Sequence, residues 1–157
     1  MKEKINFVDL RMEMFYGGKY EPIDRFLRNC AEKLIAGEEL QLSSGEQKRD
    51  ILRIEDAVGL IFTLICGSYD YGYHKFEAGS GEKHSIREIV TFMKEVVGST
   101  SELKFGAVAE RGGEPDTLAD ISWYEEVGYK MRYGYFDGLR KECMESLERT
   151  ENLLGGV

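Results

Sequence analysis

Residues 45–66 read GEQKRDILRIEDAVGLIFTLIC, and this stretch decides the fold class. Ser43 to Gly45 turn the chain and deliver Arg49 to the start of a predicted strand over Asp50 to Ile54. A largely buried helix is expected directly afterwards, over Glu55 to Cys66. A short strand that runs into a helix indicates an α/β protein.

The alternation of strands and helices continues on both sides of this stretch. Further strands are expected over Ile5 to Leu10, Glu39 to Leu42, Tyr73 to Ala78 and Leu103 to Val108. Further helices are expected over Pro22 to Ala36, from Ser85 to the stop at Gly98, and over Tyr135 to Leu153.

Two segments carry the pattern of a capping box, in which a Ser hydroxyl and a Glu three residues later satisfy the first amides of a helix. They are Ser85 to Glu88 and, less regular, Ser122 to Glu125, which would open a short helix. The pattern predicts one small mixed α/β domain over residues 1–157, with short strands and about four to five helices. These elements are too few for a complete doubly wound sheet.

The composition and net charge of the chain argue against several classes of function. Acidic residues outnumber basic ones and leave a net charge of −8, which argues against sequence-independent binding of nucleic acid. The longest apolar run, Ala57 to Cys66, is about half of what a membrane-spanning helix needs. Because the first residues lack the apolar stretch of a signal peptide, a cytoplasmic protein is expected.

Cysteine and histidine are too sparse for a metal site. Cys30, Cys66 and Cys143 lie far apart, and two of them fall on apolar faces of predicted helices, where reduced core thiols are expected. With only His74 and His84 beside them, no zinc-type ligand cluster forms at a usual spacing.

Two arginine-bearing loops are the candidate binding elements. A guanidinium fixed beside a turn, as Arg49 is, can hold a phosphate through two parallel hydrogen bonds. The competing interpretation is a polar hairpin with a solvated arginine. A second loop, Glu110 to Asp116, carries Arg111 and a glycine pair that allows close approach of the backbone to a ligand.

The order of the segments along the chain resembles the C-terminal half of the NAD-dependent epimerase/dehydratase family, the extended short-chain dehydrogenases that remodel nucleotide-linked sugars. The resemblance runs collinearly over about residues 5–147, through FVDLRMEMFYGG, GEQKRDILRIEDAV, HKFEAGSGEKHSIREIV, ERGGEPDTLADIS and VGYKMRYGYFDGLRK. It implies a substrate-binding lobe that lacks the Rossmann half.

The resemblance assigns roles to individual positions. In the family, the arginine of the G-x-Q-x-R-D turn contacts the nucleotide diphosphate, and it matches Arg49. A second diphosphate arginine matches Arg111, with Glu114 at an acidic position often near the ribose. Contacts to the base come from the preceding strand and point to Leu40 and Leu42, for which plain core packing is the alternative.

Several positions depart from the family's pattern. Met14 stands where an asparagine usually bonds the sugar nucleotide, Glu77 replaces another asparagine, and Gly18 replaces a proline. The resemblance therefore supports contacts with phosphate more than contacts with sugar.

The family's catalytic machinery is not expected in this chain. Full-length members use NAD or NADP, held by a glycine-rich turn of the form G-x-x-G-x-x-G, and no such motif occurs here. Tyr71 and Lys75 have the Tyr-x-x-x-Lys spacing, but the neighbouring Gly72 favours a loop or strand start over the required helix. The pair is interpreted as coincidence, so the sequence predicts no catalytic, cofactor-binding or metal-binding residue and no hydride transfer.

Two functions remain. The first is the nucleotide-diphosphate-sugar-binding portion of an NAD(P)-dependent epimerase, dehydratase or reductase, not catalytic alone, with a separate Rossmann-domain chain as a possible partner. The alternative is a non-enzymatic interaction or remnant domain that binds another chain through the face left by the Rossmann half, near Phe7, Phe15, Phe26 and Leu27. Such a face also predicts self-association.

Overall fold

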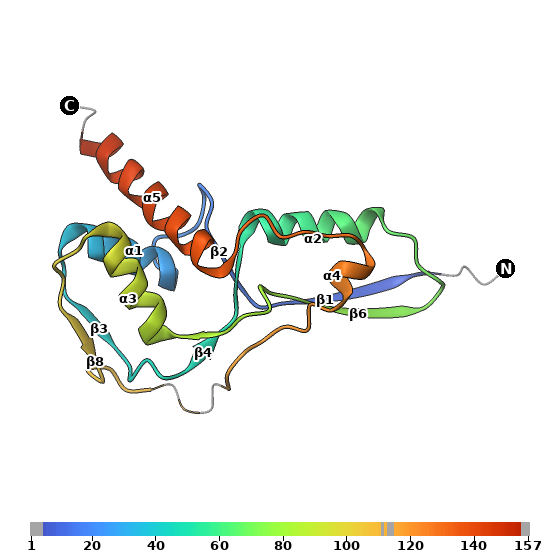
Figure 1. The fold of residues 1–157 in the computed structure, drawn as a ribbon, viewed down its shortest axis with the longest axis horizontal. Helices are drawn as coiled ribbons and strands as arrows, with labels where there is room; N and C mark the ends of the chain where they lie inside the picture. Colours follow the sequence, from blue (N-terminus) through green and yellow to red (C-terminus); the bar gives the residue numbers. More distant parts are fainter. Residues whose placement is uncertain (1–4, 111, 113–114, 155–157) are drawn as a thin grey trace.

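A computed structural model describes residues 5–110, 112 and 115–154 of the chain. Five helices alternate with short strands over these residues (Figure 1). The strands are β1 (Phe7–Met12), β2 (Met14–Tyr16), β3 (Leu40–Leu42), β4 (Lys48–Arg49), β5 (Ile51–Arg53), β6 (Tyr73–Ala78), β7 (His84–Ser85) and β8 (Leu103–Phe105). The helices are α1 (Phe26–Ala36), α2 (Ile54–Cys66), α3 (Ile86–Val97), α4 (Trp123–Glu126) and α5 (Tyr135–Leu154).

The strands form separate two-stranded ladders, and most of these are parallel. β1 pairs with β6, β2 with β5, and β3 with β8, each in parallel, while β4 and β7 run antiparallel. The longest ladder runs from Phe7 opposite Tyr73 to Met12 opposite Ala78. The expectation of a small α/β domain with short strands and four to five helices is confirmed.

One core fills the space between α1, α3, α5 and the β3–β8 ladder, at the left of Figure 1. The apolar stripe of α3 supplies Ile89, Val90 and Met93, which are fully buried. α5 contributes Leu139 and Cys143. Burial raises the pKa of the Cys143 thiol to about 12, so this side chain behaves as a small apolar group.

A second core lies under α2, against one face of the β1–β6 ladder, at the right of Figure 1. Leu60 and Leu64 of α2 meet Trp123 of α4 across this core. The opposite face of the ladder is exposed, as shown by the 60% exposure of Phe7 and the 61% exposure of Tyr73. Within the described residues, no helix is long and apolar enough to cross a membrane.

The best predicted element is α3. Ser85 Oγ accepts the Glu88 N–H, and the Glu88 carboxylate accepts the Ser85 N–H at 2.8 Å, so both bonds of the capping box form. Gly98 ends the helix in the left-handed conformation, with φ of 64°. The strand predicted over Tyr73 to Ala78 is also confirmed.

Other local predictions were wrong. The short helix expected after Ser122 is present as α4, but Ser122 makes no side-chain cap bond to it, and its N–H donates to Asp120 Oδ1 at 3.0 Å. α1 begins at Phe26 rather than near Pro22. α2 is not largely buried, since one of its apolar flanks faces solvent.

Candidate functional site

Arg49 lies at the end of β4, and its surroundings are built from distant segments. Its Nη1 donates to the Pro115 carbonyl at 2.9 Å and to the Lys48 carbonyl at 3.0 Å, and these contacts orient the guanidinium. From the other side, the Tyr135 hydroxyl donates to the Arg49 carbonyl at 2.7 Å. The turn that delivers this arginine is therefore a fixed structure and not a solvated hairpin tip.

The segment that follows Arg111 in the sequence runs directly beside β4. The Lys48 N–H donates to Asp116 Oδ1 at 2.9 Å, and the Thr117 N–H donates to the Lys48 carbonyl at 3.2 Å. Lys83 forms an ion pair with Asp116 on the same edge. Arg111 and Glu114 themselves lie outside the described residues, and the structure brings only their neighbours to Arg49.

Asp50 ties these segments together. Its carboxylate is fully buried and accepts the Ser80 N–H and hydroxyl, each at 2.6 Å, together with the N–H groups of Gly81 and Ala119, each at 3.1 Å. Its own N–H donates to Thr117 Oγ1. One side chain thus joins the residues after β6, the residues after position 115 and the strand that carries Arg49.

The strand before the arginine turn is packed into the core. The side chains of Leu40 and Leu42 are buried in the first core, at 3% and 7% exposure, while Gln41 between them points outward. Core packing, which was the alternative interpretation of these two leucines, accounts for the position of their side chains. A contact of this strand with a base would therefore use backbone groups or Gln41.

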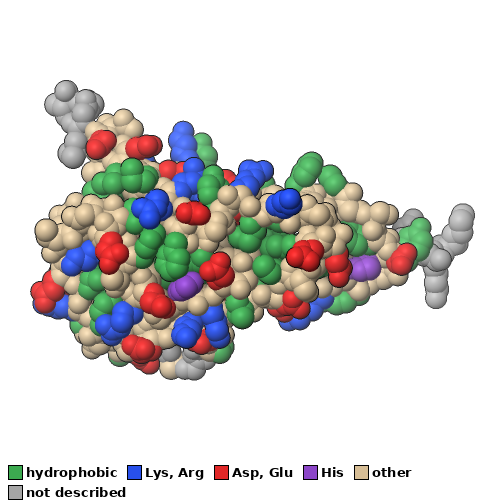
Figure 2. Space-filling view, in the orientation of Figure 1, with side chains coloured by type: hydrophobic (Ala, Val, Ile, Leu, Met, Phe, Trp, Pro, Cys, Tyr) green, Lys and Arg blue, Asp and Glu red, His purple; other side chains and the backbone are tan. Residues whose placement is uncertain are grey.

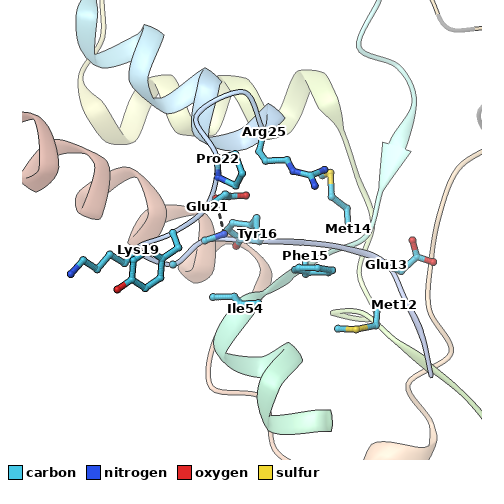
Figure 3. A pocket seen from close by; sticks show the side chains of 13 residues that line it. Met12, Glu13, Met14, Phe15, Tyr16, Lys19, Glu21, Pro22, Arg25 and Ile54 are labelled. Carbon is cyan, nitrogen blue, oxygen red and sulfur yellow. Dashed lines mark hydrogen bonds between the residues drawn. The ribbon is translucent and has the colours of Figure 1, made fainter. Parts of the chain in front are cut away.

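A pocket of about 540 Å³ lies between β2, the β2–α1 loop and the start of α2 (Figure 3). Met14, the remaining candidate site residue, lines it and is held in β2 opposite Ile51. Figure 3 shows Arg25, from just before α1, extending toward Met14. Arg49 is not among the residues that line this pocket.

The pocket contains both signs of charge. Glu21 accepts the Gly17 N–H at 2.9 Å across the loop, and burial raises the pKa of its carboxyl. Lys19 and Arg25 are the cationic lining residues, and Tyr20, 87% exposed, stands beside Lys19. Apolar side chains make up most of the rest of the lining, so a ligand with both an apolar part and a negative group matches it.

The floor of the pocket rests on a buried arginine. The Arg53 guanidinium packs so closely under Gly17 that a Cβ there would come within 2.7 Å of its Cζ. Arg53 donates to Glu142 at 2.9 Å and to Glu145 at 2.6 Å on α5, and to Glu55 at 2.8 Å. Burial lowers the pKa of the guanidinium, but the hydrogen bonds that it donates to Glu55 and Glu145 outweigh burial and raise it.

The structure therefore joins Arg49 to the neighbours of Arg111, and places Met14 in a pocket on the adjacent ladder. Sequence reasoning missed Asp50, Arg25 and Glu21. The signal for Asp50 was its place directly after Arg49 in the motif. A signal was also present for Arg53 under the pocket, because a charged residue inside an apolar strand indicates a buried ion pair.

Neither α2 nor α3 begins with a Rossmann-type dinucleotide turn. A pyrophosphate site of the Rossmann type needs a glycine-rich turn between a strand and a helix N-terminus. α2 follows β5 with no intervening loop. The first amides of α3 are taken, since the N–H groups of Ile86 and Arg87 donate to the carbonyls of Gln47 and Gly45, and the Glu88 N–H donates to Ser85 Oγ. Lys75 lies in β6 and pairs with Glu77, so it is not one helical turn from Tyr71.

The fold and the sequence are similar to those of a known class of proteins. No protein-family model matches the sequence. Comparison with known proteins nevertheless makes the chain a partial, about half-length homologue of the NAD-dependent epimerase/dehydratase family, the extended short-chain dehydrogenases. Among curated proteins, the CDP-abequose synthase of Salmonella muenchen is 25% identical over 136 residues, which are 86% of this chain and 46% of the synthase. The probable GDP-L-fucose synthase 1 of Oryza sativa subsp. japonica is 28% identical over 71% of this chain and 31% of its own length.

Solved structures show the same half-length relation. The UDP-glucose 4-epimerase of Thermotoga maritima, crystallised with UDP-glucose, matches 91% of this chain and 46% of its own, with a TM-score of 0.79 and 20% identity. MoeE5, solved with UDP-glucuronic acid and NAD, matches 91% of this chain and 47% of its own, with a TM-score of 0.77 and 26% identity. The chain thus spans about half the length of these structures.

Proposed function

We propose that the chain is the C-terminal, substrate-binding portion of a nucleotide-sugar epimerase, dehydratase or reductase, that it binds a nucleotide-diphosphate sugar, and that it is not catalytic alone. The observation that carries the proposal is the pairing of β4 with the segment after position 115. This pairing brings Arg49 together with Pro115, Asp116 and Thr117 on one edge of the molecule.

The diphosphate is assigned to the two arginines. Each charge-assisted hydrogen bond to a phosphate contributes about 1.5–3 kcal/mol. In a chain with a net charge of −8, attraction of a dianionic ligand has to come from such local cations. The sugar is assigned to the pocket at Met14, where Arg25 and Lys19 supply donors.

The proposal predicts that a nucleoside diphosphate binds more tightly than the matching nucleoside. Isothermal titration calorimetry with uridine, cytidine and thymidine diphosphates tests this on the wild type, Arg49→Ala and Arg111→Ala. Loss of either arginine should weaken diphosphate binding by roughly tenfold to a hundredfold and leave nucleoside binding nearly unchanged. Arg→Lys at either position should recover part of the loss, since a point charge replaces a planar fork.

Arg140→Ala is the matched control, because Arg140 is an exposed arginine of α5 whose guanidinium lies over the ring of Phe92. Its diphosphate affinity should equal that of the wild type. Equal affinity in all variants, or no binding of any diphosphate by the wild type, refutes the assignment of a nucleotide site.

A further inference from the structure

A buried cluster of charges lies beneath the β2–α1 loop, which forms one wall of the pocket at Met14. At its centre, Arg53 at the end of β5 meets Glu142 of α5, and their side chains are only 1% and 0% exposed. Ion pairs to both residues and among their partners complete the group, called here the Arg53 cluster. Its members are Arg53, Lys141 and Arg149 with Glu55, Glu142 and Glu145.

Burial sets the Arg53–Glu142 pair apart from the surface charges of this chain. On the face of the molecule shown in Figure 2, acidic and basic side chains are interspersed at the surface. Replacing a buried ion pair by uncharged residues of similar size is often neutral or stabilising, so a gain in stability does not by itself account for the pair. The contacts of Arg53 support a role in fixing the geometry of its neighbours.

The guanidinium of Arg53 directs its edge to the carboxylates and its face to the loop. Its Nε donates to Glu55 at 2.8 Å, Nη1 to Glu142 at 2.9 Å and Nη2 to Glu145 at 2.6 Å, and these donors lie in the plane of the group. A Cβ on Gly17 would meet Cζ at 2.7 Å, Nη1 at 2.8 Å and Nε at 2.9 Å. Because the central carbon is the nearest of the three atoms, Gly17 lies over the face of the plane.

The first turn of the loop lies on two successive side chains. Gly17 and Gly18 have φ of 93° and 90°, Gly17 lies on Arg53, and a Cβ on Gly18 would meet Ile54 Cγ2 at 3.3 Å. The Glu21 carboxylate accepts the Gly17 N–H at 2.9 Å. Gly17 is therefore held between the guanidinium and the Glu21 carboxylate. Since the two glycines and Glu21 all line the pocket, the position of Arg53 determines the position of this wall.

We propose that Arg53 is a positioning residue for the sugar. Held by Glu142 and Glu145 of α5, it sets the conformation of the β2–α1 loop in which the pocket binds the sugar part of a nucleotide sugar. This inference rests on the proposed function, which assigns the pocket to the sugar. Arg53 does not line the pocket and acts through Gly17. Binding of the sugar is thereby coupled to the packing of the last helix.

Two variants of the full 157-residue chain separate positioning from stability. Arg53→Met/Glu142→Gln removes both buried charges while keeping side chains of similar length, so the fold should be retained. Arg53→Lys keeps the charge and can still pair with Glu142, but it has no planar face to place under Gly17. Circular dichroism and urea unfolding establish that each variant is folded.

Hydrogen exchange reads the loop without a ligand. The Gly17 amide is protected by its bond to Glu21, and mass spectrometry follows the exchange of peptides over residues 16–25. In the double variant these peptides should exchange roughly tenfold faster than in the wild type, while α3, which carries its own caps, should be unchanged. Loop exchange as slow as in the wild type overturns the proposal. Equal acceleration in the loop and in α3 shows a general loss of stability and overturns it too.

Calorimetry then compares UDP with UDP-glucose, UDP-galactose and UDP-glucuronic acid. The sugar that binds most tightly relative to UDP in the wild type should lose roughly tenfold in affinity in the double variant, and Arg53→Lys should lie between. UDP itself, which is assigned to Arg49, should bind nearly as in the wild type.

Arg140→Met is the matched control, because it removes an exposed arginine of α5 that does not line the pocket. It should change neither the exchange of the loop nor the affinity for the sugar. A wild type that binds UDP but gains no affinity from any of the three sugars overturns the proposal, as does a double variant that keeps the gain. A wild type that binds no diphosphate refutes the proposed function instead, and the exchange measurement still decides whether Arg53 positions the loop.

Discussion

Asp50→Asn removes one charge from the centre of the candidate site while keeping the size of the side chain. The carboxylate has Ser80 on Oδ1, and Gly81 and Ala119 on Oδ2. An amide can present its oxygen to only one of these sides, so in either orientation at least one buried backbone N–H faces an NH2 group. An unsatisfied buried donor costs about 1–3 kcal/mol, and the other bonds lose their charge assistance, so we expect a loss of about 2–4 kcal/mol in the free energy of unfolding.

Urea unfolding followed by Trp123 fluorescence measures this loss, since Trp123 is the only tryptophan and its indole N–H donates to the Glu77 carbonyl in the second core. Asp120→Asn is the control, because that carboxylate is exposed and bonds the neighbouring Ser122, whose N–H it accepts at 3.0 Å. It should stay within about 0.5 kcal/mol of the wild type. If Asp50→Asn also stays within that margin, Asp50 does not hold the three segments together.

Two further predictions concern the pocket. Gly17→Ala combines a φ of 93° with a Cβ that meets Arg53 at 2.7 Å, and should lower the free energy of unfolding by about 1–3 kcal/mol in urea titration. Gly98→Ala, at φ of 64° in open space, should lose only about 1 kcal/mol. Because burial raises the folded pKa of Glu21 above its usual 4.5, this group favours the folded state at low pH and loses that contribution as pH rises. The stability of Glu21→Gln relative to the wild type should therefore increase between about pH 4 and pH 7, and an unchanged difference would contradict the burial of this carboxyl.

The sequence predicted those elements whose hydrogen bonds join residues that are close together in the chain. The capping box at Ser85 and the stop at Gly98 lie within a few residues of the groups they satisfy, and α3 was predicted from them. The strand expected over Asp50 to Ile54 is present as the shorter β5 (Ile51–Arg53). It begins after Asp50, whose N–H bonds Thr117, a residue far along the chain, and β4 (Lys48–Arg49) before it was not expected. The exposure of Phe62 was equally beyond sequence reasoning, since an apolar run does not show what covers it.

The candidate site likewise has a part that the sequence could predict and a part that it could not. The motif placed Arg49 beside a turn, and the structure places it there. The contribution of Arg25 and Glu21 depends on the shape of the loop after β2. That shape requires a positive φ at Gly17 and the Arg53 guanidinium beneath it, whose partners lie on the last helix.

The bond between Arg53 and α5 also bears on the order in which the chain can fold as it is synthesised. Arg53 is 2% exposed, and its partners Glu142 and Glu145 are translated about ninety residues later. Until α5 has been synthesised, Glu55 is the one of these three carboxylates that Arg53 can contact, so the full set of ion pairs that holds β5 in its final position forms only after α5 leaves the ribosome. The pocket at the N-terminal end of the sequence is therefore among the last parts of the molecule to form.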